Sequence, residues 1–140
     1  MTDDMDDSQN DRNEEMPTPL GELALQTVAM PADTNADGDV FGGWLVSQMD
    51  LAGAVTANRL AKGRVATVAI DTMVFLRPVA VGSTVSCYTK VLEIGRSSIA
   101  INVEVWAQHP TDYETRKVTE GRFTFVAIDQ NRRTRPVPRH

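Results

Sequence analysis

Residues 42–61, GGWLVSQMDLAGAVTANRLA, decide the fold, because they form the one long helical pattern in the chain. At the standard rise per residue, this segment predicts a helix of roughly 30 Å. The Lys-Gly pair at 62–63 ends it. Apolar side chains such as Trp44 and Met49 spread around the whole circumference, and polar ones are few. Because a helix that is apolar nearly all round is a buried helix, we expect the remaining elements to surround it.

The segments around this helix predict a sheet. Four stretches rich in Val, Ile, Thr and aromatic residues follow it, separated by turn signals: residues 65–75, 84–94, 97–107 and 117–128. The third alternates, with Ile99, Ile101, Val103 and Val105 on one face and Ala100, Asn102, Glu104 and Trp106 on the other. This alternation predicts one buried and one exposed face, as in antiparallel sheets. The fold class that follows is α+β, with a curved antiparallel sheet wrapped around a long central helix.

The residues upstream of the helix are less decisive. The segment LGELALQTVAM, residues 20–30, is compatible with a short helix or a strand. Residues 32–41, rich in Asp, Asn and Gly, have turn chemistry. Residues 1–19 have almost nothing to bury, so we expect a disordered acidic tail there and a single domain over residues 20–138.

The charge distribution argues against several partners. Residues 1–16 carry seven acidic side chains against Arg12, and the rest of the chain is nearly neutral. A nearly neutral body lacks the basic excess of a nucleic-acid-binding protein, although four arginines form a small basic tail at residues 132–139. No apolar run approaches the roughly 18 residues of a membrane span, and the amino-terminal end is acidic, unlike a signal peptide. We therefore expect a cytoplasmic protein without membrane or nucleic-acid partners.

Metal and thiol chemistry are also disfavoured. Cys87 is the single cysteine and the chain has two histidines, which is too sparse for zinc. Residues 33–39, DTNADGD, match the first seven positions of an EF-hand loop, but Trp44 occupies the position of its bidentate glutamate. Cys87 lies inside a predicted strand with no identifiable base, and His109 lies in a predicted turn. We expect no metal site and a packing role for Cys87, which leaves a carboxylate as the best catalytic group.

Asp50 is the most informative carboxylate, because it lies in the middle of the predicted helix between Met49 and Leu51. A charge in so apolar a segment needs a reason, and catalysis is one. The alternative is that Asp50 forms a structural ion pair or lies at an exposed edge of the helix. The residues alone leave both interpretations open.

Gly42 and Gly43 open the same helix. Because they have no Cβ atoms, a ligand can approach the backbone N–H groups that the start of the helix leaves unpaired. Such N–H groups would form a binding site for an oxyanion or a phosphate. A loop that needs flexible backbone angles before the helix is equally compatible with the pair. A P-loop is excluded, because the Gly-Lys-Ser/Thr sequence is missing.

The sequence resembles the bacterial hot-dog acyl-CoA thioesterases of the YciA type. The likeness runs from about residue 20 to residue 138. It is carried by DTNADGDVFGGWLVSQMD, KGRVATVAIDTMVFLRPVAVGSTV, GRSSIAINVEVW and FTFVAID. It implies a helix wrapped by an antiparallel sheet, dimers that pair their sheets edge to edge, and commonly three dimers in a hexamer.

The resemblance also implies an active site at the dimer interface. By motif position, Asp50 corresponds to the catalytic carboxylate and Asn35 to an asparagine contributed by the opposing subunit. Gly42 and Gly43 mark the helix end that binds the thioester carbonyl. The implied reaction is hydrolysis of an acyl-CoA to coenzyme A and a carboxylic acid, without a cofactor, with Asp50 as general base or as nucleophile.

The remaining expectations concern the substrate. For the phosphates of coenzyme A we expect Lys62, Arg64 and Arg96, with Ser97 and Ser98 as hydroxyl donors. The acyl-chain preference depends on which of Met49, Met73, Val74 or Phe75 closes the acyl pocket. Two other functions are compatible with the same fold. One is a non-catalytic acyl-CoA sensor, and the other is a hydratase or dehydratase, which normally needs a well-placed histidine base.

Overall fold

The computed structural model describes residues 18–139. The predicted acidic tail at 1–19 therefore lies, up to residue 17, outside the described residues, and so does His140.

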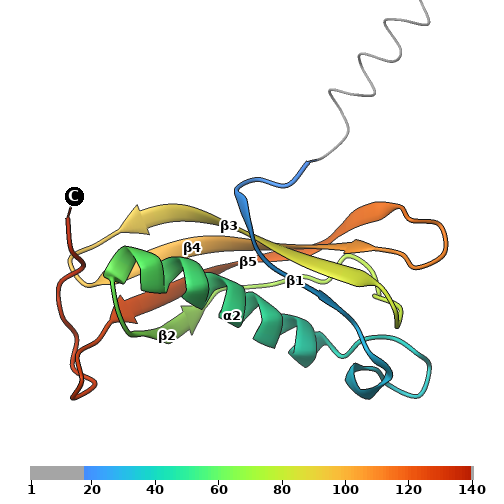
Figure 1. Ribbon diagram of the computed structural model, residues 1–140, viewed down its shortest axis with the longest axis horizontal. Helices are drawn as coiled ribbons and strands as arrows, with labels where there is room; N and C mark the ends of the chain where they lie inside the picture. Colours follow the sequence, from blue (N-terminus) through green and yellow to red (C-terminus); the bar gives the residue numbers. More distant parts are fainter. Residues whose placement is uncertain (1–17, 140) are drawn as a thin grey trace, which may run out of the picture.

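The described residues form one helix on one face of an antiparallel sheet (Figure 1). The elements are β1 (Glu22–Val28), the short 3-10 helix η1 (Pro31–Asp33), α2 (Gly42–Ala61), β2 (Val65–Ile70), β3 (Thr84–Ile94), β4 (Ser98–Gln108) and β5 (Thr115–Ala127). The strand order is β1-β3-β4-β5-β2, and each neighbouring pair is antiparallel. This arrangement confirms the predicted α+β fold class.

The predicted helix 42–61 has the bounds of α2. Lys62 ends it in the left-handed conformation, with φ of 53°, and its backbone N–H donates to the carbonyl of Asn58. The ambiguous segment 20–30 contains the strand β1 and no helix. The predicted strand 65–75 stops at Ile70, because beyond it only single backbone bonds, such as Asp71 N–H to Arg122 O, join the chain to β5.

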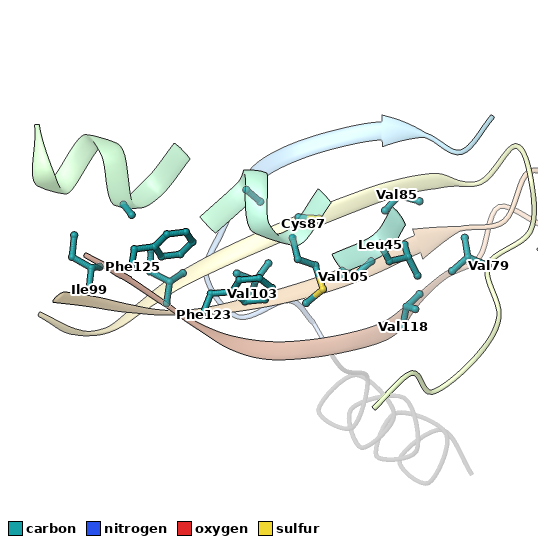
Figure 2. Close-up of a cluster of buried hydrophobic side chains, with 14 of the residues drawn as sticks. Leu45, Val79, Val85, Cys87, Ile99, Val103, Val105, Val118, Phe123 and Phe125 are labelled. Carbon is teal, nitrogen blue, oxygen red and sulfur yellow. The ribbon is translucent and has the colours of Figure 1, made fainter. Parts of the chain in front are cut away.

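The core lies between α2 and the inner face of the sheet (Figure 2). Its largest buried side chains include Phe123 and Phe125 of β5 and Met49 of α2. Gly53 permits a close approach of α2 to the sheet: a Cβ there would lie 2.7 Å from the ring of Phe125. Because Gly53 has no side chain, α2 can pack directly against the ring of Phe125.

The composition of α2 predicted a helix that is buried on all sides. In the structure, one side of it is exposed. Leu51 and Val55 are 54% and 47% exposed, although Leu45, Met49 and Ala52 are buried. The physical reason is that the sheet covers only one side of α2 within one chain. The opposite apolar side remains open.

The outer face of β4 also differs from expectation. Glu104, predicted to be exposed, is 1% exposed, and Trp106 is 4% exposed. The chain before β1 crosses this face, and the Leu20 N–H donates to Glu104 Oε2 at 2.8 Å. Trp106 Nε1 donates to the other carboxylate oxygen at 3.2 Å, and Lys117 Nζ lies 3.4 Å from it. Burial of Glu104 is tolerated because both of its oxygens have donors.

Candidate active site

Asp50 is partly buried on α2, beside the edge strand β2. Its Oδ1 accepts a hydrogen bond of 2.6 Å from the hydroxyl of Thr67 on β2. Within residues 18–139, no basic side chain lies within 4.0 Å of its carboxylate. The structural ion pair that would have explained this aspartate is therefore not found in the described chain. Thr67 is a contact that the sequence analysis missed, since nothing in the pattern of β2 marks it.

The start of α2 offers unpaired backbone donors. Phe41 precedes the helix in an extended conformation, and its carbonyl accepts from the N–H groups of Trp44 and Leu45 at 3.1 and 3.3 Å. The N–H groups of Gly42 and Gly43 have no acceptor in the described part of the chain. Unpaired donors at the positive end of a 20-residue helix favour a partially negative oxygen.

The backbone does not require glycine at these two positions. Neither Gly42 nor Gly43 has a positive φ. A Cβ on Gly43 would meet nothing within 4 Å, and one on Gly42 would meet the ring of Phe75 at an ordinary 3.6 Å. The interpretation of the pair as a conformationally demanding loop is therefore wrong. The open space above Gly43 is available to a group from outside this chain.

An apolar groove of about 420 Å³ lies beside the helix start, lined by Gly42, Phe75 and Val79 among others. Of the residues considered for closing an acyl pocket, Phe75 lines this groove. Met49 is fully buried in the core instead.

Asn35 lies in the loop between η1 and α2, with an exposed side chain. Its Oδ1 accepts from the backbone N–H groups of Asp37 and Asp39, at 2.9 and 3.1 Å. The loop thus occupies the carbonyl side of the amide. The Nδ2 group, which can only donate, makes no hydrogen bond with the described residues and is the part of Asn35 free to meet a ligand.

Within one chain, the N–H groups of Gly42 and Gly43 lie far from the carboxylate of Asp50. Gly42 and Gly43 precede Asp50 by seven or eight helical residues, which is roughly 10–12 Å along the axis. The unpaired N–H groups also point away from the body of the helix. A carbonyl held by these donors is therefore out of reach of Asp50 of the same chain.

The five residues expected at the phosphates of coenzyme A lie together at one end of the sheet. Lys62 and Arg64 lie in the connection from α2 to β2, Arg96 and Ser97 lie in the connection from β3 to β4, and Ser98 is the first residue of β4. The two connections meet through β5, because Ala127 pairs with Val65 and its N–H donates to the carbonyl of Ser97. Lys62 is roughly 18 Å along the helix from Asp50.

The carboxyl-terminal segment joins this basic end, which the sequence analysis did not predict. Arg135 Nη2 donates to the carbonyl of Ala61 at 2.8 Å, and Arg139 Nη2 donates to that of Gly95 at 2.7 Å. The Val137 N–H donates to the carbonyl of Arg96. Arg135 and Arg139 of the tail are thus brought to the end of the sheet where Arg64 and Arg96 lie.

The other reactive side chains are poorly placed for catalysis. Cys87 is fully buried among apolar neighbours, as expected for a packing cysteine, and this burial raises the pKa of its thiol to about 12. The Nδ1 atom of His109 is within 2.9 Å of the Thr111 hydroxyl in the β4–β5 turn. A thiolate at Cys87 is therefore not available at neutral pH.

Two further features concern metals and membranes. In the described range, no three side chains of the His, Cys, Asp and Glu types gather closely enough to hold a metal ion. The helical part of the described structure also contains no segment of the length and apolarity needed to cross a membrane.

The chain is similar to proteins of known family. Residues 37–114 match the family model described as "Thioesterase superfamily". The acyl-CoA thioester hydrolase YciA of Salmonella typhimurium is 54% identical over 125 residues, which cover 86% of this chain and 93% of the relative. The Escherichia coli protein of the same name is 51% identical over 124 residues, covering 86% and 93%.

Solved structures agree with these relatives. A hexameric broad-specificity acyl-coenzyme A thioesterase superposes with a TM-score of 0.85 at 50% identity, covering 89% of this chain and 86% of its own. A hexameric hotdog fold thioesterase of Campylobacter jejuni superposes with a TM-score of 0.80 at 42% identity, covering 84% and 91%. These likenesses confirm the hot-dog fold and the resemblance on which the site residues were chosen. The chain belongs to the thioesterase superfamily.

Proposed function

We propose that this protein hydrolyses acyl-CoA thioesters and that Asp50 is its catalytic carboxylate. The observation that carries the proposal is the environment of Asp50: partly buried on an apolar helix, without a basic partner in the described chain, and held through one oxygen only. The other oxygen, Oδ2, has no hydrogen-bond donor among the described residues. A carboxylate with one free oxygen in such surroundings is suited to act as a base or a nucleophile.

The catalytic site is shared between two subunits. Because one chain holds Asp50 roughly 10–12 Å from the Gly42 and Gly43 donors, a single chain does not assemble them around one carbonyl. A second subunit that supplies Asn35, Gly42 and Gly43 opposite Asp50 completes the site. The thioester carbonyl then accepts from the helix N–H groups, and the developing negative charge on its oxygen is stabilised by the positive helix end.

The reaction follows from these positions. Asp50 either takes a proton from water, whose oxygen attacks the carbonyl carbon, or attacks that carbon itself to form an anhydride that water then opens. In both routes the carbon–sulfur bond breaks, the sulfur leaves with the bonding pair and is protonated, and the acyl group leaves as a carboxylic acid. Asn35 contributes its Nδ2 donor. The reaction as proposed needs no cofactor, since coenzyme A is part of the substrate.

The phosphates of coenzyme A bind at the basic end of the sheet. Lys62, Arg64 and Arg96 provide the positive charge there, and the hydroxyls of Ser97 and Ser98 provide neutral donors. An extended pantetheine arm has to bridge the roughly 18 Å between this end and Asp50.

The protein assembles as a homo-oligomer, with dimers as the catalytic unit and three dimers in a hexamer. Two observations support a dimer. The strand β2 is an edge of the sheet, so its outward N–H and C=O groups lack partners in the described chain. Apolar side chains also remain exposed on and beside it: Leu51, Val55, Val68, Ile70, Val74 and Leu76. The hexamer is supported by the solved relatives described as hexameric.

Replacement of Asp50 by Asn tests the proposal. The variant keeps the shape of the side chain and an acceptor for Thr67, but it is a poor base and nucleophile. We expect kcat for release of free thiol from acyl-CoA to fall roughly 100-fold or more. Asp112→Asn, an exposed Asp-to-Asn change in the β4–β5 turn, is the matched control and should retain full activity.

Two results would contradict the proposal. Near-wild-type turnover in Asp50→Asn would remove Asp50 from the chemistry. A wild-type protein that binds acyl-CoA but releases no thiol, with short, medium or long acyl chains, would instead be an acyl-CoA sensor.

A further inference from the structure

We propose that Arg135 is a positioning residue for the recognition of coenzyme A, and that it makes the protein favour acyl-CoA over thioesters that lack phosphates. The inference rests on the proposed binding of the coenzyme A phosphates at Lys62, Arg64 and Arg96. It adds the residue that holds this basic end of the sheet together. Arg135 is one of four arginines in residues 132–139, and nothing in the sequence pattern singles it out.

The carboxyl-terminal segment joins the two connections that carry the basic side chains. Thr134 forms an isolated bridge with Ile128, the residue after β5. The Ile128 N–H donates to the carbonyl of Arg64 in the α2–β2 connection at 3.0 Å. The N–H of Val137, a residue that is 3% exposed, donates to the carbonyl of Arg96 in the β3–β4 connection at 2.8 Å. The segment therefore lies against both connections, beside the end of α2 (Figure 1).

The hydrogen bonds of the Arg135 guanidinium within the described chain all go to backbone carbonyls. Its Nη2 donates to Ala61 at 2.8 Å, its Nε to Ile128 at 3.1 Å and its Nη1 to Pro136 at 3.4 Å. A Cβ on Gly63 would lie 2.7 Å from Nη2, so the guanidinium packs directly against the α2–β2 connection. One side chain thus joins the last residue of α2 to the residue after β5.

Arg135 also changes the electrostatics at the end of α2. The last carbonyls of a helix are unpaired and give its carboxyl-terminal end a partial negative charge. The helix ends at Ala61, directly before Lys62, so this charge would disfavour a phosphate bound beside Lys62. The positive guanidinium on the Ala61 carbonyl offsets the negative helix end. The place proposed for the phosphates is thereby made more favourable for anions.

The other basic side chains at this end are available to a ligand. Lys62, Arg64 and Arg96 form no ion pair within residues 18–139. The acidic residue nearest to Arg135 in the sequence, Asp129, accepts from two backbone N–H groups of its own turn. The roles therefore differ: Arg135 donates to the protein and holds the connections in place, and the other three cations contact the phosphates.

The test compares wild type, Arg135→Gln and Arg135→Lys in the intact oligomer, by thiol release from two thioesters of the same acyl group. One is the acyl-CoA, and the other is the acyl-pantetheine, which lacks the phosphates. In Arg135→Gln, KM for acyl-CoA should rise roughly 10-fold, with kcat within about twofold, because the phosphate site is no longer held in place. The kinetics with acyl-pantetheine should stay within about twofold of wild type. Arg135→Lys keeps the charge but not the planar fork of donors, so its KM for acyl-CoA should lie between the two.

Arg133→Gln is the matched control, because it removes one positive charge from an exposed position of the same segment. It should change KM for acyl-CoA less than about twofold. An equal rise in KM for Arg133→Gln and Arg135→Gln would overturn the inference, since net charge alone would then matter.

The two substrates separate the remaining outcomes. An unchanged KM for acyl-CoA in folded Arg135→Gln would overturn the inference, and so would an equal loss with both thioesters, which would indicate damage to the whole site. If Arg135→Gln does not fold, Arg135→Lys is judged by the same two criteria. Equal KM values for both thioesters in the wild type would instead overturn the proposed phosphate site. No thiol release from either would overturn the proposed hydrolysis, so these failures are distinguishable.

Discussion

Glycines on α2 serve two different purposes, although the sequence does not distinguish them. A Cβ at Gly53 would lie 2.7 Å from the Phe125 ring, whereas one at Gly43 would meet nothing within 4 Å. Gly53 is explained by packing inside this chain. Gly43 is not, and its open surroundings fit the proposed approach of a thioester carbonyl.

This difference predicts opposite results for the same substitution. Gly43→Ala should leave stability unchanged or raise it by up to about 1 kcal/mol, because alanine favours the helix, while kcat/KM falls. Gly53→Ala should destabilise the protein by about 1–3 kcal/mol through overpacking. Denaturant unfolding and thiol-release kinetics on both variants measure the two effects. A Gly43→Ala enzyme with wild-type kcat/KM would show that nothing binds closely at the helix start.

At the scale of elements, a buried carboxylate on the outer face of the sheet, that of Glu104, anchors the segment before β1. Glu104 on β4 accepts one hydrogen bond from the backbone N–H of Leu20, just before β1, and another from Trp106 Nε1. The side chain of Lys117 on β5 completes its surroundings. Glu104 thus links the segment before β1 to the strands β4 and β5.

Removal of this anchor should loosen the start of the fold. We expect Glu104→Ala to lower the free energy of unfolding by about 1–3 kcal/mol, because buried donors lose their acceptor. Hydrogen exchange of the Leu20 amide should accelerate, while amides in the middle of β4 and β5 exchange as before. Glu120→Ala, which removes the exposed carboxylate that also contacts Lys117, is the matched control. An unchanged exchange rate at Leu20 would show that Glu104 does not hold this segment.

At the scale of the whole molecule, the proposed site requires two chains. The Asn35 loop and the helix start belong to one end of α2, and Asp50 lies near its middle. If both groups act on one substrate from different subunits, a chain defective in one can complement a chain defective in the other.

Co-refolding of Asn35→Ala with Asp50→Ala subunits tests this arrangement. Random pairing makes about half of the dimers mixed. In each mixed dimer one site carries both lesions and the other is intact, so about a quarter of all sites should recover if each substitution is inactivating. Each variant refolded alone is the control. If mass spectrometry shows exchanged subunits but thiol release does not return, Asn35 and Asp50 do not share a site across the interface.

Much of the local structure could be predicted from the sequence. The helix α2 has its predicted bounds, because an apolar run without proline and a Lys-Gly end are local signals. The strands β3 and β4 were likewise placed within one residue of their ends by their composition and flanking turns. The motif around Asp50 identified the family, which the comparisons confirm.

Only the tertiary structure decided the contacts between distant segments. Glu104 is polar in an alternating strand, which predicts exposure, yet a backbone group 84 residues away buries it. The partner of Asp50 is a threonine 17 residues away, brought into contact by strand pairing and a bulge. The arginines of the carboxyl-terminal segment reach the basic end in the same way. Sequence patterns report preferences within a few neighbouring residues, whereas burial and hydrogen-bond partners depend on which segments the complete fold places side by side.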